Sequence, residues 1–177
     1  MWERQESLVN LQILEIGAGT SLPGILAAKL GANVTLSDCA TLPKTLAHIE
    51  RACSLNGLKA DQDIKIVGLS WGLLLDSIFT LGPLDLIIGS DCFYDPSVFE
   101  DVLVTISFLL EKNPNARFIF TYQERSSDWT FQSLLRKYSL ECVNISLDSI
   151  GRRSGININR DFLQGQVIYL LEITLKR

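Results

Sequence analysis

The sequence has few of the residues on which many catalytic centres depend. It contains one histidine, His48, and four cysteines that form no Cys-x-x-Cys pair. This scarcity argues against a zinc site and against Ser-His-Asp or Cys-His catalysis, so we predict no metal. His48 lies within a helical pattern, which indicates a surface or packing residue. We expect reduced, mostly buried thiols at Cys39, Cys53, Cys92 and Cys142.

An excess of positive charge and a long apolar run are also missing. The net charge of −4 at pH 7 argues against a protein that holds nucleic acid through phosphate contacts. No apolar run approaches the roughly 20 residues of a membrane-spanning helix. The charged start, MWERQESLVN, does not resemble a signal peptide. We therefore predict neither a direct nucleic-acid partner nor a membrane partner.

Short apolar runs alternate with segments of helical period along most of the 177 residues. This alternation predicts a single α/β domain of buried parallel strands and connecting helices. Pro23 suits the first turn of a helix and Gly31 its end, and a serine or aspartate within 126–128 is a plausible helix cap. The predicted strands are 11–17, 33–38, 63–68, 84–91 and 116–122, and the predicted helices are 21–31, 41–57, 96–112 and 126–138.

The alternation stops near residue 140. Residues 140–147 and 165–175 read as two strands joined by a polar loop without a helix, which predicts an antiparallel hairpin. Five βα units need right-handed crossovers, so helices should cover both faces of the sheet. The predicted fold is a Rossmann-like, doubly wound sheet of seven strands, mostly parallel with an antiparallel C-terminal hairpin.

The stretch LEIGAGTSLPG, residues 14–24, is the strongest candidate for a ligand-binding turn. Gly17 and Gly19 end the first predicted strand, where parallel sheets of this kind bind their ligands. No Gly-Lys-Ser/Thr follows, so the turn is not a phosphate-binding P-loop. Asp38 ends the second predicted strand, where a carboxylate accepts bonds from ribose hydroxyls. Glu15 occupies a buried strand, so we expect it to meet a polar or cationic partner.

With an acid two residues before its first glycine, this stretch resembles motif I of the class I S-adenosylmethionine-dependent methyltransferases. The similarity continues through VTLSD, VGLSWG (67–72), DLIIGSDCFYDP (85–96), FEDVLVTISFLL and TYQERSSDW (121–129). Together these segments resemble the seven-strand protein methyltransferases of family 16. The resemblance implies S-adenosyl-L-methionine as cofactor and transfer of its methyl group to a side-chain nitrogen of a protein.

The resemblance also implies roles for the residues of the cofactor site. Gly17 and Gly19, preceded by Glu15 of the motif, would face the methionine part of the cofactor. Asp38 would hold its ribose, and Trp71 would lie near the adenine. An ordinary packed aromatic is the alternative for Trp71.

The segment Asp91-Cys92-Phe93-Tyr94 matches the family's D-x-x-Y motif, beside the reacting methyl group. Asp91 would also contact the cofactor and orient the substrate cation, and Tyr94 would shape the nitrogen pocket. Asp95 and Glu124 are further candidates near this centre. The alternative is a capped strand end at which Asp95 and Pro96 start the next helix.

A histone arginine is the first choice of substrate that the resemblance implies, and lysine is the second. Such a protein would work in the nucleus and the cytoplasm. The acidic balance of the chain suits a basic protein partner. We interpret Arg152, Arg153 and Arg160 as a solvated basic loop rather than a binding surface.

One feature departs from the family pattern. Family 16 proteins carry a longer N-terminal segment with a tryptophan-containing stretch over the cofactor, whereas only Trp2 precedes the first strand here. A non-catalytic binding or regulatory module that keeps the sheet is therefore the alternative function. A nicotinamide-dependent oxidoreductase is disfavoured, because the spacing is G-x-G-x4-G where the dinucleotide fingerprint is G-x-G-x-x-G.

Overall fold

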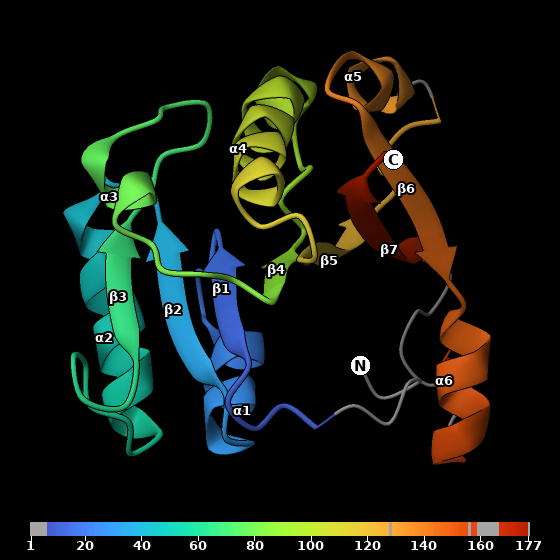
Figure 1. Cartoon of the computed structure of the whole chain (residues 1–177). Coiled ribbons are helices and arrows are strands. Elements are labelled where there is room, and N and C mark those ends of the chain that lie inside the picture. The colour runs from blue at the N-terminus through green and yellow to red at the C-terminus, as the bar shows by residue number, and fades with distance from the viewer. Residues whose placement is uncertain (1–6, 128, 156, 159–166, 177) are drawn as a thin grey trace.

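The computed structural model describes residues 7–127, 129–155, 157–158 and 167–176. Its strands form one seven-stranded sheet in the order β3-β2-β1-β4-β5-β7-β6 (Figure 1). The strands are β1 (Gln12–Ile16), β2 (Asn33–Asp38), β3 (Lys65–Gly68), β4 (Leu86–Ser90), β5 (Arg117–Gln123), β6 (Leu140–Ile145) and β7 (Ile168–Leu175). The helices are α1 (Leu22–Lys29), α2 (Pro43–Leu55), α3 (Asp76–Phe79), the 3-10 helix η2 (Pro96–Val98), α4 (Phe99–Lys112), α5 (Gln132–Lys137) and α6 (Leu147–Ser154).

The pairing of the strands confirms the predicted fold class. Strands β1 to β5 are parallel, with β1 at the centre between β2 and β4. Strand β7 then enters antiparallel between β5 and β6. The strand order reverses at β1 and β4, so the carboxyl ends of these two strands border the crevice in which such sheets bind ligands.

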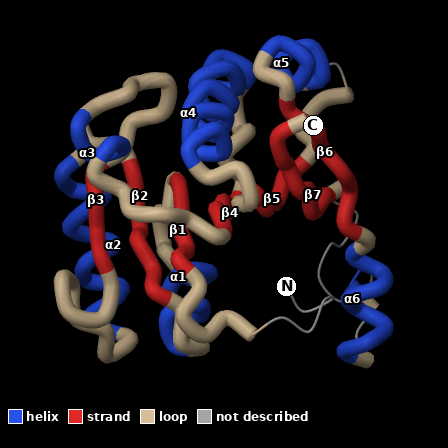
Figure 2. The backbone as a smooth tube through the Cα atoms, in the orientation of Figure 1, coloured by secondary structure: helices blue, strands red, loops and turns tan. Residues whose placement is uncertain are grey.

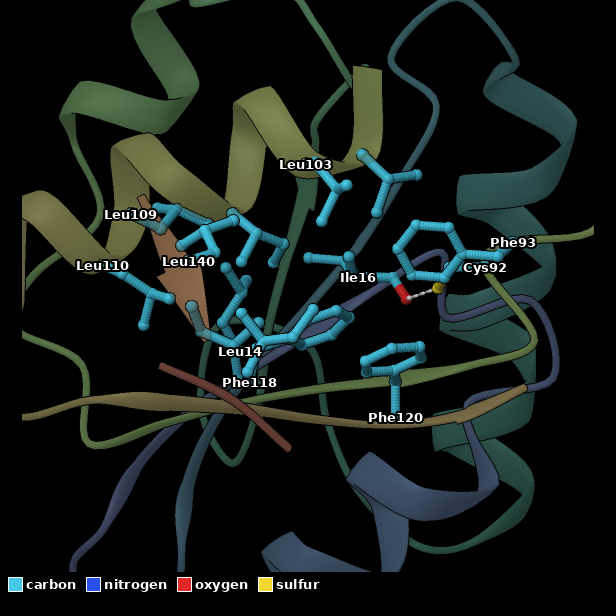
Figure 3. Packing of buried hydrophobic residues seen from close by; sticks show 14 of the residues in the cluster. Leu14, Ile16, Cys92, Phe93, Leu103, Leu109, Leu110, Phe118, Phe120 and Leu140 are labelled. Carbon is cyan, nitrogen blue, oxygen red and sulfur yellow. Dashed lines mark hydrogen bonds between the residues drawn. The ribbon is translucent and has the colours of Figure 1, made fainter. Parts of the chain in front are cut away.

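The alternation of side chains along the strands divides the core into two layers. On β1, Leu14 and Ile16 pack with α4 and the aromatic residues of β5, whereas Ile13 packs with α1 and α2 on the opposite face. Figure 3 shows Leu14 and Ile16 beneath α4, with Phe118 and Phe120 beside them. Helices therefore cover both faces, as predicted (Figure 2).

Three details of the helices differ from the prediction, and the first is the four-residue α3, which was not predicted. The link between β6 and β7 contains α6, so the antiparallel pair is confirmed but the helix-free loop is wrong. Ser146 starts α6 by accepting a bond from the N–H of Ser149, and Gly155 ends it in the left-handed conformation. Basic residues Arg152 and Arg153 thus belong to a helix, with Arg152 exposed; Arg160 lies outside the described residues.

The fifth helix also begins later than predicted. Its N-cap is Phe131, not a serine or aspartate of 126–128 (Asp128 is outside the described residues). The ring of Phe131 stacks on Phe93 at 5.0 Å, and Trp129 meets Phe99 edge-on at 6.1 Å. Packing of these rings into the core holds residues 129–131 outside a helix where the polar sequence predicts a helix start.

Candidate active site

The glycine turn joins β1 to α1 at the crevice. Gly17 and Gly19 have φ of +56° and +49°, in the left-handed region that residues with a Cβ rarely adopt. The Ala18 N–H donates to the carbonyl of Ser37 on β2 over 2.9 Å. Around Gly19, a Cβ would meet no atom closer than the Gly17 carbonyl oxygen at 3.9 Å. The turn is therefore tight in its backbone and open at Gly19, which allows a ligand to approach the main chain.

Asp38 links the turn to the end of β2. Its Oδ2 accepts the N–H of Gly19 over 2.9 Å, and its Oδ1 accepts the N–H of Cys39 over 2.7 Å. A carboxylate has about four lone-pair sites, so each oxygen keeps acceptor capacity after these bonds. The structure thus brings Asp38 and Gly19 together, and contact of this carboxylate with a ribose stays a prediction.

Glu15 lies beneath the turn rather than at its surface. Its side chain is 1% exposed, and Oε2 accepts the N–H of Gly24 in the first turn of α1 over 2.9 Å. Burial raises its pKa to about 7, and the bond from Gly24 acts in the opposite direction. The polar partner expected for Glu15 is confirmed. A direct contact with cofactor stays a prediction, because this carboxylate supports the helix start.

Trp71 lies across the glycine turn. A Cβ on Gly17 would lie 2.7 Å from Cζ2 of Trp71, so the indole packs on the bare backbone of that glycine. The next residue, Gly72, anchors this segment to α4, since its N–H donates to Oγ1 of Thr105 over 2.9 Å. The indole is 6.3 Å from the ring of Tyr94, centroid to centroid. The structure therefore joins Gly17, Trp71 and Tyr94, and contact of Trp71 with adenine stays a prediction.

Asp91 follows β4 with φ of +57°, a conformation in which aspartate is enriched. Its N–H donates to the carbonyl of Thr121 on β5 over 2.9 Å. Its carboxylate receives two bonds from Arg125: Nη1 donates to Oδ1 over 2.9 Å, and Nη2 donates to Oδ2. Both side chains remain partly exposed, at 41% for Asp91 and 31% for Arg125. A carboxylate at the crevice thus already holds a guanidinium in a forked pair.

The neighbours of Asp91 have separate tasks. Tyr94 is 49% exposed and turns its ring toward Trp71. Asp95 caps η2, because its Oδ1 accepts the N–H and the hydroxyl of Ser97, and these bonds lower its pKa. Glu124 accepts the Tyr169 hydroxyl over 2.9 Å. The predicted helix start at Asp95 is therefore present, and Asp91 and Tyr94 of the D-x-x-Y motif directly precede it.

The remaining sequence candidates lie away from this chemistry. His48 is exposed on α2, as predicted. The four cysteines are free; Cys53 and Cys92 are buried, whereas Cys39 and Cys142 are partly exposed, so burial is less general than predicted. Desolvation raises the pKa of Cys92 to about 12, and its thiol contacts the Ile16 carbonyl at 3.6 Å (Figure 3).

Sequence reasoning missed Arg125, although the residue stands within TYQERSSDW. The available signal was a cation just after predicted strand 116–122, at the same sheet edge as Asp91. Over the described residues, no group of three or more His, Cys, Asp or Glu could hold a metal ion. No helix in the described ranges combines the length and apolarity needed to cross a membrane.

Several methyltransferases are similar in sequence to this chain. Histone-arginine methyltransferase METTL23 of Xenopus laevis is 40% identical over 100% of this chain and 74% of its own length. METTL23 of Homo sapiens is 47% identical over 84% of this chain and 77% of its own length. The chain covers 58% of METTL23 of Mus musculus. Protein-lysine methyltransferase METTL21E of Bos taurus is 37% identical over 62% of this chain and 38% of its own length.

Solved structures support the fold alone. A ribosomal protein L11 methylase of Lactobacillus delbrueckii covers 99% of this chain with a TM-score of 0.65 and 21% identity, over 74% of its own chain. A TehB-like S-adenosylmethionine-dependent methyltransferase of Corynebacterium glutamicum covers 95% with a TM-score of 0.64 and 18% identity, over 82% of its own chain.

A family model described as lysine methyltransferase matches residues 3–138. S-adenosylmethionine is the cofactor of these enzymes, and the geometry fits it. The open backbone at Gly19 suits close approach of the methionine part, and Asp38 retains capacity for the ribose. The chain therefore belongs to family 16 of the seven-strand, S-adenosylmethionine-dependent protein methyltransferases.

Proposed function

We propose that this protein methylates a side-chain nitrogen of a histone arginine, with lysine as the second choice. The relatives METTL23 of Xenopus laevis and Homo sapiens are named histone-arginine methyltransferases, whereas METTL21E of Bos taurus is named a protein-lysine methyltransferase. The observation that carries the preference is the forked pair between Asp91 and a guanidinium at the crevice. A site that already accommodates one guanidinium has the right shape for another.

In this proposal a substrate arginine takes the place that Arg125 occupies on Asp91. Exposed ion pairs contribute only about 0–1 kcal/mol, and both partners here are partly exposed. The cost of displacing Arg125 is therefore small compared with the binding of a peptide. Tyr94 and Trp71 then border the nitrogen and reduce its contact with water.

Asp91 is needed because the attacking nitrogen must lose its charge. S-adenosylmethionine supplies an electrophilic methyl group on its sulfonium. Removing a proton at pH 7 costs roughly 4.6 kcal/mol for lysine and roughly 7.5 to 9 kcal/mol for arginine, from their ordinary pKa values. A carboxylate that holds the guanidinium in line orients its nitrogen and accepts the proton that this nitrogen releases on methylation.

The partner and the place of action follow from the same proposal. A net charge of −4 suits a basic protein partner. We place the protein in the nucleus and the cytoplasm, where histones are held and made. Fluorescence microscopy of the tagged chain tests this location, and exclusion from the nucleus would contradict a chromatin substrate.

The decisive experiment measures methyl transfer from labelled S-adenosylmethionine to core histones, followed by mass spectrometry of the modified residue. We expect methylarginine, and a loss of about 100-fold or more for Asp91→Asn. Asn tolerates the left-handed backbone of this position. Asp61→Asn is the matched control, because Asp61 is exposed and has a φ of +61° in the turn before β3. Methylation confined to lysine, or full activity of Asp91→Asn, would contradict the proposal.

A further inference from the structure

A pocket of about 530 Å³ lies beside the candidate active site, between α5 and the face of β5, β7 and β6. Its size falls within the range of about 300–1,000 Å³ that is usual for ligand sites. Helices α4 and α5 lie on the same side of the sheet, and β6 is its edge strand (Figure 1). None of the roles described above uses this pocket.

Four aromatic rings line this pocket together with leucine side chains. Tyr122 and Tyr169 are nearly parallel, with centroids 6.2 Å apart, and Phe131 stands edge-on to Tyr122 at 5.8 Å. Trp129 adds a fourth ring. The faces of aromatic rings attract ammonium and guanidinium groups, and these four rings line the pocket.

Charged and polar groups complete the lining. Glu124 and the exposed Glu141 bring two carboxylates, and Arg136 brings one guanidinium. The Tyr122 hydroxyl is buried without a hydrogen-bond partner among the described residues. Burial and the nearby Glu124 raise the pKa of Tyr122, so the phenol stays neutral and can donate or accept a bond. The excess of carboxylates favours a cation in this space.

The pocket is close to the position of the methylated nitrogen. Tyr122 directly follows Thr121, whose carbonyl accepts the N–H of Asp91. Tyr122 and Glu124 are one and three residues beyond Thr121, which places them within about 10 Å along a strand that rises about 3.3 Å per residue. An extended peptide with one arginine at Asp91 can therefore place a side chain two to four residues away in the pocket.

We propose that this pocket binds a second basic side chain of the peptide substrate and so selects targets with two nearby cationic residues. Its aliphatic stem packs on the rings of Tyr122 and Phe131, and its charged head reaches Glu141. This inference rests on the proposed methylation of a basic protein, and it adds a sequence requirement around the target.

The test measures binding of synthetic peptides to the full chain saturated with S-adenosylhomocysteine, by calorimetry. One peptide has a single arginine, and the others have a second arginine two, three or four residues away or uncharged citrulline at that place. We expect the best second arginine to tighten binding about 10-fold. Glu141→Gln and Trp129→Leu should each reduce this gain to less than 3-fold, with Glu111→Gln as the exposed control.

A variant that should strengthen binding of the second arginine distinguishes a lost contact from a misfolded protein. Arg136→Gln removes the one guanidinium that lines the pocket among the described residues, so it should increase the gain from the second arginine. Equal binding of all peptides by the native chain, or a gain that survives both Glu141→Gln and Trp129→Leu, would overturn the proposal. Methyl transfer to the single-arginine peptide is measured separately, because its failure tests the proposed function and leaves the second-arginine binding to be judged by calorimetry.

Discussion

Replacing Glu15 by glutamine should remove a pH dependence from the stability of this protein. Glutamine has almost the same volume, and its amide oxygen can accept the N–H of Gly24 as the carboxylate does. The substitution therefore leaves the packing beneath α1 intact and removes one titrating group. Burial raises the pKa of Glu15 from 4.5 to about 7 in the folded state.

The sign follows from proton binding in the two states. Below pH 4.5 the carboxyl is protonated both folded and unfolded. Between pH 4.5 and about 7 the unfolded chain loses this proton while the folded protein keeps it, so stability falls as pH rises. Above about pH 7 both states are ionised, and the penalty of the buried charge is constant. Over this interval the free energy of unfolding falls by about 3 kcal/mol, since one pKa unit corresponds to about 1.36 kcal/mol.

Urea unfolding followed by tryptophan fluorescence at pH 4.5, 5.5, 6.5 and 8 provides the assay. The free energy of unfolding of Glu15→Gln relative to the native chain should increase with pH and level off at about 3 kcal/mol at pH 8. Glu50→Gln, an exposed glutamate of α2, is the control. A difference between Glu15→Gln and the native chain that does not change with pH would refute the reasoning.

Three further predictions concern the turn, the ion pair and the thiols. Gly17→Ala should destabilise by about 1–3 kcal/mol and abolish S-adenosylhomocysteine binding, because the new Cβ would be in a left-handed conformation and 2.7 Å from an indole atom; chemical unfolding and calorimetry measure both, and unchanged affinity would contradict it. Arg125→Gln should lower KM for an arginine peptide up to about 5-fold by freeing Asp91; a 10-fold higher KM would show instead that Arg125 assists substrate binding. Cys39 should react first with a maleimide at pH 7.5, since bonds from Thr41 and Ser70 lower its pKa, and Cys92 should react only on unfolding; mass spectrometry of labelled peptides would contradict this if Cys92 were modified in the folded protein.

Local sequence patterns predicted many of the strands and helices. Strand β2, Asn33–Asp38, was predicted at its observed bounds, because β-branched and apolar residues fill it and an aspartate ends it. Pro23 and Gly31 marked the ends of α1 in the same way. In contrast, α6 is eight residues long and mostly polar, with Leu147 and Ile150 as its apolar residues, and the sequence prediction missed this short amphipathic pattern.

The residues of the candidate site differ in the same way, because some belong to local patterns and others meet only in the folded sheet. Gly17, Gly19 and Asp38 belong to a local pattern, and the structure brings the turn and the carboxylate together. The pair between Arg125 and Asp91 joins residues 34 positions apart, and only the adjacency of β4 and β5 brings them together. Sequence spacing does not show which strands are neighbours, so this contact needed the structure.

The central claim is that the turn at Gly17 and Gly19, with Asp38, binds S-adenosylmethionine. Thermal unfolding of the chain with S-adenosylhomocysteine, with NADH and with neither ligand tests it most directly. At 100 times its dissociation constant a ligand stabilises by about 2.7 kcal/mol, which corresponds to a midpoint about 5–10 °C higher for a chain of this size. We expect that rise with S-adenosylhomocysteine alone and its loss in Asp38→Ala. A folded protein that shows no rise, or an equal rise with NADH, would contradict it.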